Sequence, residues 1–171
     1  SSEGWFGWLR MECDKRGWNL IIPKMPNTDK PKIEEWVGKL KEIINIDDNT
    51  YFIGHSIGCQ AVIRYLEQLQ SKEKIKGVVF VAGWFNLKED SYENNEEKNI
   101  AKPWIETPIN FEKIKKHTKN FLAIFSTNDY FVPLSDSKKF EKELSAKIII
   151  KKNQGHFNEV LEIPEILEFL K

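Results

Sequence analysis

The chain has 171 residues, of which 40% are hydrophobic, so it can bury one core but is too short for two domains of typical size. Its 26 basic residues balance its 26 acidic residues, and this balance provides no overall field that would attract nucleic acid or an anionic membrane surface. We therefore expect a single domain over residues 1–171 that acts on a small neutral or mixed-charge molecule, with a protein partner as a further option.

The two cysteines, Cys13 and Cys59, are too few for a disulfide framework and do not have the spacing of a metal site. We therefore expect free thiols in a reducing compartment. The sequence contains no signal-peptide pattern and no apolar run of about 18 residues, the length that a membrane-spanning helix needs. These observations predict a cytoplasmic protein that does not enter a membrane, although the chain begins at Ser1 rather than at a methionine.

Short apolar segments that are rich in β-branched or aromatic residues recur along the chain. They are typical of strands buried on both faces of a parallel sheet. The five segments are residues 19–23, 50–54, 77–83, 120–126 and 146–152.

Helical patterns alternate with these predicted strands. One begins near Pro31, which suits a first helical position, and a second follows Ser56 with one apolar stripe. Two more begin at Pro133 and at Pro164. The alternation predicts an α/β fold, a doubly wound and mainly parallel sheet with helices on both faces.

Residues 85–106 break the pattern, because they are polar, rich in Glu, Asn and Lys, and interrupted by Pro103. They show no sustained apolar period. We expect an excursion that leaves the sheet after the strand at 77–83, either as a lid or mobile loop over a site or as a solvated insertion with no role in binding.

The segment Gly-His-Ser-Ile-Gly at residues 54–58 lies between a predicted strand and a predicted helix. This is the G-x-S-x-G pattern of a nucleophile elbow, a sharp strand-to-helix turn that exposes the serine. Short matches to this pattern also arise by chance. The strand before it and the helix after it favour Ser56 as a nucleophile.

A serine nucleophile needs a base that takes its proton and an acid that orients the base. Asp129 follows the strand at 120–126, and His156 follows the strand at 146–152. Because the carboxyl ends of parallel strands meet at one edge of a sheet, we expect both side chains at the same edge as Ser56. The order Ser56, Asp129, His156 is also that of α/β-hydrolases.

Each of these residues has a competing interpretation. Asp129 could simply cap the turn before Pro133, and His156 could be an ordinary turn residue. Asp136 is a second candidate acid, but it lies inside a predicted helix, where we expect it to be solvated. Among the other histidines, His55 should point away from Ser56 in a tight elbow, and His117 lies in a basic stretch typical of the surface.

Six stretches, which together span nearly the whole chain, carry a resemblance to a known family. They are "WFGWL", "IIPKMPNTDKPKIEEWV", "YFIGHSIGCQAVIRYLEQL", "VVFVAGWF", "STNDYFVPLSDSKKF" and "QGHFNE". The chain resembles the α/β-hydrolase superfamily, and within it the small serine hydrolases that include retinoblastoma-binding protein nine and its bacterial relatives. The resemblance implies a triad of Ser56, Asp129 and His156. It also implies an oxyanion hole to which the backbone N–H of Ile57 contributes.

The chain departs from these relatives at its front. In the relatives, a strand that ends in a His-Gly turn precedes the segment matching residues 1–9 and supplies the second oxyanion donor. The superfamily order places this strand between those at 19–23 and 50–54. The resemblance therefore implies roughly ten further residues upstream, and a separation of about 10 Å between those two strands with no direct ladder.

We conclude from the sequence that the chain is a serine hydrolase of small esters, thioesters or amides. It should work through an acyl-enzyme and require neither a metal nor an organic cofactor. The alternative is a protein-interaction module on the same fold with weak or no catalysis. A nucleotide-binding domain is disfavoured, because neither G-x-G-x-x-G nor G-x-x-x-x-G-K-[ST] occurs.

Overall fold

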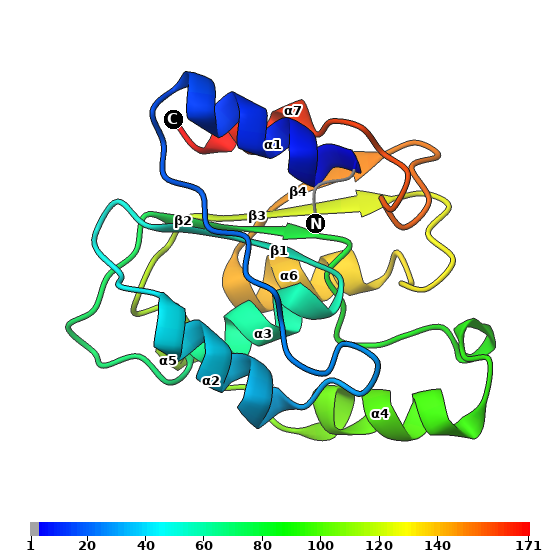
Figure 1. Ribbon diagram of the computed structural model, residues 1–171. Coiled ribbons are helices and arrows are strands. Elements are labelled where there is room, and N and C mark those ends of the chain that lie inside the picture. The colour runs from blue at the N-terminus through cyan, green and yellow to red at the C-terminus, as the bar shows by residue number, and fades with distance from the viewer. Residues whose placement is uncertain (1–3) are drawn as a thin grey trace.

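The computed structural model describes residues 4–171, so residues 1–3, with which the expected domain begins, lie outside the described part of the chain. Its described part centres on a parallel sheet of four strands in the order β1-β2-β3-β4 (Figure 1). Four of the predicted strands are confirmed, with small shifts at their ends. Their bounds are β1 (Tyr51–His55), β2 (Gly77–Val81), β3 (Phe121–Ser126) and β4 (Lys147–Lys151).

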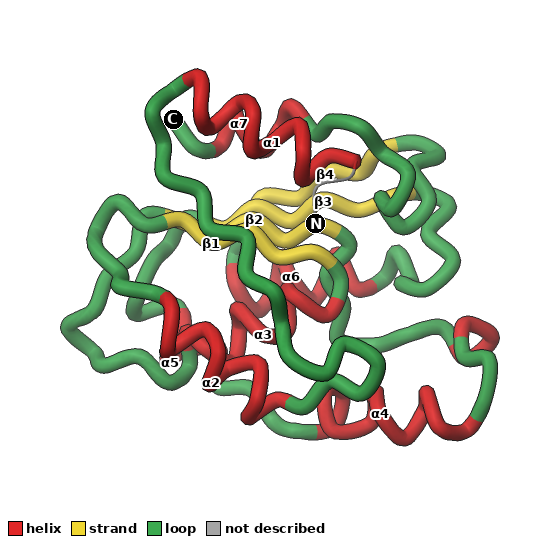
Figure 2. The backbone as a smooth tube through the Cα atoms, in the orientation of Figure 1, coloured by secondary structure: helices red, strands yellow, loops and turns green. Residues whose placement is uncertain are grey.

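The first predicted strand, at residues 19–23, is wrong. These residues run as a loop between the first two helices (Figure 2), and within residues 4–171 they make no backbone hydrogen bond. Leu20 is partly buried against the core, so the apolar pattern reflects packing without a ladder. No strand forms here, so β1 is an edge of the described sheet and, as expected, has no ladder with residues 19–23. The separation of about 10 Å between the two segments stays a prediction.

Helices cover both faces of the sheet, as predicted. On one face lie α1 (Gly4–Lys15) and α7 (Pro164–Phe169), and on the other lie α2 (Ile33–Ile43), α3 (Ile57–Leu66) and α6 (Asp136–Leu144) (Figure 1). Sequence reasoning did not predict α1. Its signal is a stripe of buried residues at a spacing of four, namely Trp5, Leu9 and Cys13. No helix within residues 4–171 is both long and apolar enough to cross a bilayer.

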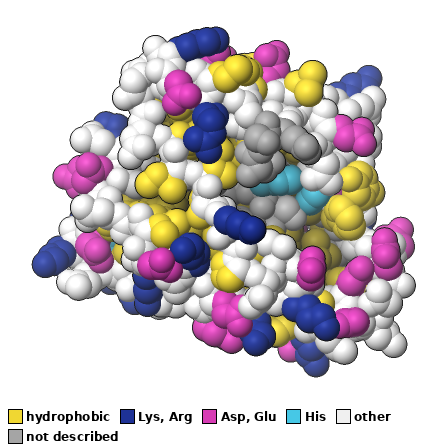
Figure 3. All heavy atoms as spheres, viewed as in Figure 1, with side chains coloured by type: hydrophobic (Ala, Val, Ile, Leu, Met, Phe, Trp, Pro, Cys, Tyr) yellow, Lys and Arg dark blue, Asp and Glu magenta, His cyan; other side chains and the backbone are white. Residues whose placement is uncertain are grey.

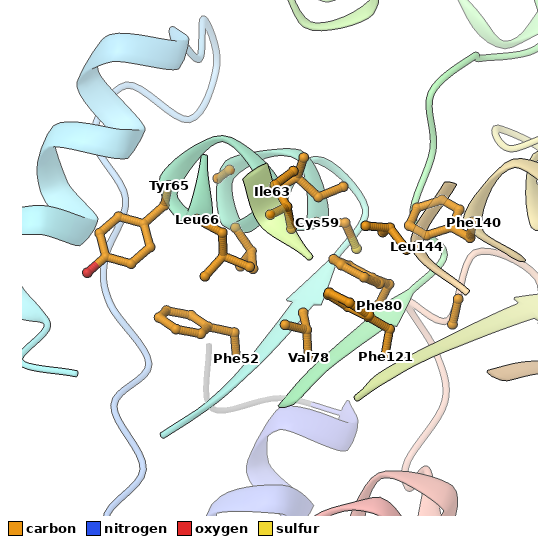
Figure 4. Close-up of a cluster of buried hydrophobic side chains, with 14 of the residues drawn as sticks. Phe52, Cys59, Ile63, Tyr65, Leu66, Val78, Phe80, Phe121, Phe140 and Leu144 are labelled. Atoms are coloured by element: carbon orange, nitrogen blue, oxygen red, sulfur yellow. The ribbon is translucent and has the colours of Figure 1, made fainter. Parts of the chain in front are cut away.

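Alternate residues of the central strands pack into two separate cores. In β2, Val78 and Phe80 contribute to the core beneath α3 and α6, whereas Val79 and Val81 contribute to the core beneath α1 and α7. Figure 4 shows part of the first core between α3 and the strands, where Phe80 lies close to Phe121. Full burial of such side chains contributes about 1.5–3 kcal/mol each, which fixes the strands that carry the predicted site.

The polar excursion at residues 85–106 is more ordered than the sequence predicted. After a 3-10 turn, η1 (Glu89–Ser91), it forms the helix α4 (Asn95–Glu106), and the short helix α5 (Phe111–Ile114) follows. The Asn94 side chain caps α4 by accepting a hydrogen bond from the Glu97 N–H. Trp104 is buried, and the Arg64 guanidinium of α3 donates to its carbonyl oxygen at 2.9 Å. Sequence reasoning did not predict this helix, and the role of the excursion as a lid stays a prediction.

Asp136 is buried rather than solvated, with only 3% of its surface exposed. Its Oδ2 accepts from the backbone N–H groups of Phe85 at 2.6 Å and Asn86 at 2.8 Å, and its Oδ1 accepts from the Asn86 side-chain amide. Asp136 is also the first residue of α6, and the dipole of that helix favours a negative charge at its N-terminus. Asp136 thus joins α6 to the start of the excursion.

Substitution of Asp136 tests this assignment. We expect Asp136→Ala to lower the free energy of unfolding by about 1–3 kcal/mol, because it leaves two backbone N–H groups without an acceptor. Asp48→Ala, at an exposed position, should change it by less than about 0.5 kcal/mol. Urea unfolding measures both variants, and equal stabilities would show that the contact contributes nothing.

Candidate active site

The predicted nucleophile lies on a sharp strand-to-helix turn. β1 ends at His55 and α3 begins at Ile57, so Ser56 alone joins them. Its backbone has φ 52° and ψ −122°, a conformation that is strained for any residue with a side chain. Hydrogen bonds hold it there, because the Ser56 N–H donates to Val81 O at 2.9 Å and the Cys59 N–H donates to Ser56 O at 3.0 Å.

The two glycines of the motif differ in what surrounds them. A Cβ atom on Gly54 would lie 2.7 Å from the Cα atom and 2.8 Å from the backbone nitrogen of Cys59. Such contacts cannot be relieved by a side-chain rotation. Around Gly58, a Cβ atom would meet no described atom within 4 Å. The close return of α3 onto β1 therefore requires glycine at position 54.

The predicted acid and base are in direct contact. His156 Nδ1 lies 2.8 Å from Asp129 Oδ2 and 3.1 Å from Oδ1, and both side chains are about 95% buried. Because an ionised carboxylate can only accept, Nδ1 carries the proton. In the neutral imidazole this arrangement leaves the lone pair on Nε2 free to take a proton.

The contact is one of four successive bonds between the turn after β3 and the loop after β4. The side chains of residues 126–129, which are the last residue of β3 and the turn after it, bond to residues 153–156, and we call this set the loop clamp. In the three other bonds, backbone N–H groups donate to side-chain oxygens: Gln154 to Ser126 Oγ at 2.9 Å, Asn153 to Thr127 Oγ1 at 3.1 Å and Gly155 to Asn128 Oδ1 at 2.8 Å. The clamp fixes the backbone on either side of the predicted acid–base pair.

The surroundings of Asp129 favour its ionised form. Burial acts to raise its pKa, but hydrogen bonds from His156 and from the N–H groups of Val132 and Phe131 outweigh burial, so the pKa lies below the usual value. Those two N–H groups donate to Oδ1 at 2.9 Å and 2.8 Å. The Lys88 ammonium, from the excursion, donates to the Asp129 carbonyl oxygen at 2.6 Å. Asp129 is thus a fixed negative charge beside the imidazole.

His55 has a contact that the sequence did not reveal. Its Nε2 lies 2.8 Å from the backbone oxygen of His156, and the two imidazole rings are 5.2 Å apart. Burial lowers the pKa of His55 to about 4, so the ring is neutral at physiological pH. The only sequence signal was its place next to the predicted nucleophile.

The other histidine and the other candidate acid that the sequence offered do not contact the Asp129–His156 pair. The prediction that His117 lies at the surface is wrong, because only 1% of its surface is exposed. His117 precedes β3 in the chain, and its Nδ1–H donates to the backbone oxygen of Glu73 at 2.7 Å. Asp136 bonds to residues 85 and 86 rather than to a histidine. The hydroxyl of Ser56 makes no hydrogen bond with any described residue. Figure 3 shows histidine atoms at the surface of the face that it views.

An open cavity of about 710 Å³ lies against the loop after β4. Its lining includes His156 but not Ser56, so it lies beside the predicted site rather than over the serine. Within residues 4–171, no three His, Cys, Asp or Glu side chains are grouped so as to hold a metal ion. The lining residues are Asn128, Tyr130, Lys151, Asn153, Gln154, Gly155, His156, Asn158, Glu159, Val160, Leu161, Glu162 and Pro164.

Comparison with known proteins gives consistent matches. A family model described as serine hydrolase matches residues 1–162. YdeN of Bacillus subtilis, a protein named as a hydrolase by inference, is 29% identical over 160 residues, which are 93% of this chain and 80% of YdeN. The crystal structure of that gene product superposes with a TM-score of 0.87 and 27% identity, over 99% of this chain and 90% of the other.

Two further matches come from other organisms. Serine hydrolase RBBP9 of Rattus norvegicus is 26% identical over 172 residues, which cover 100% of this chain and 87% of RBBP9. A crystal structure from work on carboxylesterases of Nitrososphaera gargenis has a TM-score of 0.66, over 96% of this chain and 82% of the other. At 13% identity, that likeness concerns the fold alone.

The two glycines at residues 54 and 58 allow a matched test of the elbow. Gly54→Ala should lower the free energy of unfolding by about 1–3 kcal/mol, because the added methyl overlaps the backbone of Cys59. Gly58→Ala lies within α3 and should stabilise or leave stability unchanged, by up to about 1 kcal/mol. Equal unfolding midpoints in urea for the two variants would contradict the close approach at Gly54.

Proposed function

The chain belongs to the serine hydrolase family and is a hydrolase with an α/β-hydrolase fold, and from this premise we propose that Ser56, His156 and Asp129 form its catalytic triad. The observation that carries the proposal is the buried contact of 2.8 Å between His156 Nδ1 and Asp129 Oδ2. Further support comes from Ser56, a half-buried serine with strained backbone angles on the strand-to-helix turn at the carboxyl end of β1, as a nucleophile elbow requires.

In the proposed reaction, the Ser56 hydroxyl attacks the carbonyl carbon of the substrate. As the C–O bond forms, His156 Nε2 takes the hydroxyl proton, and the carbonyl electron pair moves onto its oxygen. Asp129 holds the imidazole through Nδ1–H and stabilises the imidazolium. Collapse of the intermediate expels the leaving group, which receives the proton from His156. Water then attacks the acyl carbonyl carbon while His156 Nε2 takes its proton, and collapse breaks the bond to the Ser56 oxygen, which receives that proton as the carboxylic acid leaves.

We also propose the backbone N–H of Ile57 as one donor of the oxyanion hole. Ile57 is the first residue of α3, and the first N–H groups of a helix have no partner within it. In residues 4–171 this N–H makes no backbone hydrogen bond. It also lies at the positive end of the helix dipole, so negative charge on the substrate oxygen would be stabilised there.

The substrate class that we propose is a small ester, thioester or amide. A serine hydroxyl activated by histidine attacks carbonyl carbon, and the groups that the mechanism needs all come from side chains and backbone of the chain. The reaction as written therefore uses no metal or organic cofactor. Cys13 and Cys59 are buried free thiols, and the reaction as written makes no use of them.

Removal of the nucleophile or the base tests the proposal. Ser56→Ala and His156→Ala should each lower kcat for a p-nitrophenyl ester by on the order of a thousandfold or more. The double variant should be little worse than either single variant, because residues of a triad act as a unit. Ser71→Ala, at an exposed serine, is the control. Near-normal turnover by folded Ser56→Ala protein would refute the assignment, whereas absence of turnover by the unsubstituted protein would favour the interaction module.

The role of the acid has a separate test. Asp129→Asn should keep the fold but lower kcat by up to about ten-thousandfold, because an amide would favour the wrong tautomer of His156. Asp136→Asn should change kcat little, since that carboxylate does not contact His156. Steady-state kinetics measure both variants. If Asp136→Asn lowered kcat and Asp129→Asn did not, Asp136 rather than Asp129 would be the acid.

A further inference from the structure

The hydrogen bond between His55 and His156 has a defined direction. Its acceptor is a backbone carbonyl oxygen, which has no proton to give, so His55 Nε2–H is the donor. The separation of 2.8 Å is short for an N–H···O bond. The bond thus runs from the residue before the proposed nucleophile to the main chain of the proposed base.

This bond comes from β1, whereas the bonds of the loop clamp come from the end of β3 and the turn after it. The loop clamp ties residues 153–156 to the turn after β3, and β3 is separated from β1 by β2. In the described part of the chain, the His55 bond is the one hydrogen bond that joins residues 153–156 to the elbow. Without it, the placement of the proposed base relative to Ser56 would depend on less direct links through β2 and through α1, whose Trp5 N–H donates to Val160 O at 2.9 Å.

The surroundings of His55 keep its ring in place and uncharged. The rings of Trp5 and Phe6, from α1, lie 5.9 Å and 6.2 Å from it at steep angles. The titratable groups that face it among the described residues are His156 and Asp129. A neutral ring adds no charge that would compete with His156 for the carboxylate.

We propose that His55 is a positioning residue, which holds the main chain of His156 against the elbow so that the imidazole of His156 is aimed at the Ser56 hydroxyl. The proposal rests on the proposed function of Ser56 and His156. His55 itself exchanges no proton with the substrate. Its contribution is the alignment of two groups, and a misplacement of about 1 Å can cost on the order of a hundredfold in rate.

The test compares two substitutions that differ in the donor. His55→Gln places an amide N–H near the position of the lost Nε2–H, whereas His55→Leu fills a similar volume without a donor. With a p-nitrophenyl ester, His55→Leu should lower kcat by on the order of tenfold to a hundredfold, while KM stays within about twofold. His55→Gln should keep kcat within about threefold of the unsubstituted protein.

Hydrogen–deuterium exchange provides a readout that does not depend on activity. Exchange of the amides at residues 153–157 should be roughly threefold to tenfold faster in His55→Leu than in the unsubstituted protein, as expected for loss of one hydrogen bond. His55→Gln should restore slow exchange. Unchanged exchange in His55→Leu would overturn the proposal.

A control on the same strand separates positioning from stability. Phe52→Leu removes buried volume from β1 but faces the core beneath α3, so it should lower the melting temperature with little effect on kcat. Equal losses of kcat in Phe52→Leu and His55→Leu, or in His55→Gln and His55→Leu, would overturn the proposal. Failure of the unsubstituted protein to hydrolyse esters or to react with a fluorophosphonate would instead overturn the proposed function.

Discussion

The arrangement of the site depends on the hydrogen bonds of the loop clamp. A loop between a strand and a helix has backbone N–H groups without partners in a ladder, and each hydrogen bond that they make to the rest of the protein contributes about 0.5–1.5 kcal/mol. Here side chains of residues 126–128 accept three such bonds in succession, and Asp129 accepts from the imidazole of His156. The bonds that hold the loop therefore also set the position of His156, the proposed base.

The turn at Ser56, the proposed nucleophile, is held in a strained backbone conformation. A non-glycine residue at φ 52° is strained by about 1–3 kcal/mol. Bonds at the Ser56 N–H and carbonyl oxygen, and the close approach of Gly54 to Cys59, leave the backbone no relaxed alternative. Two well-packed cores on either face of the sheet oppose this strain. Ser56 follows β1 and His156 follows β4, so both lie at the edge where the parallel strands end.

Sequence reasoning succeeded where the signal was local. Four strands, and the places of Ser56, Asp129 and His156 after them, follow from short apolar runs and the residues that end them. It failed where a long-range contact decided the outcome. Residues 19–23 have a strand-like composition but no partner strand in the described chain, α4 is held by the buried Trp104 despite its polar sequence, and Asp136 and His117 are buried through backbone contacts distant in sequence.

The most direct measurement of the central claim, that Ser56 is an activated nucleophile, is mass spectrometry of the protein after reaction with a fluorophosphonate. Trypsin should release residues 42–64 as one peptide, in which Ser56 is the single serine. The account predicts one adduct per chain, on Ser56 of this peptide, because only a serine with an oriented base reacts readily. The absence of an adduct, or an adduct on a different residue, would contradict it.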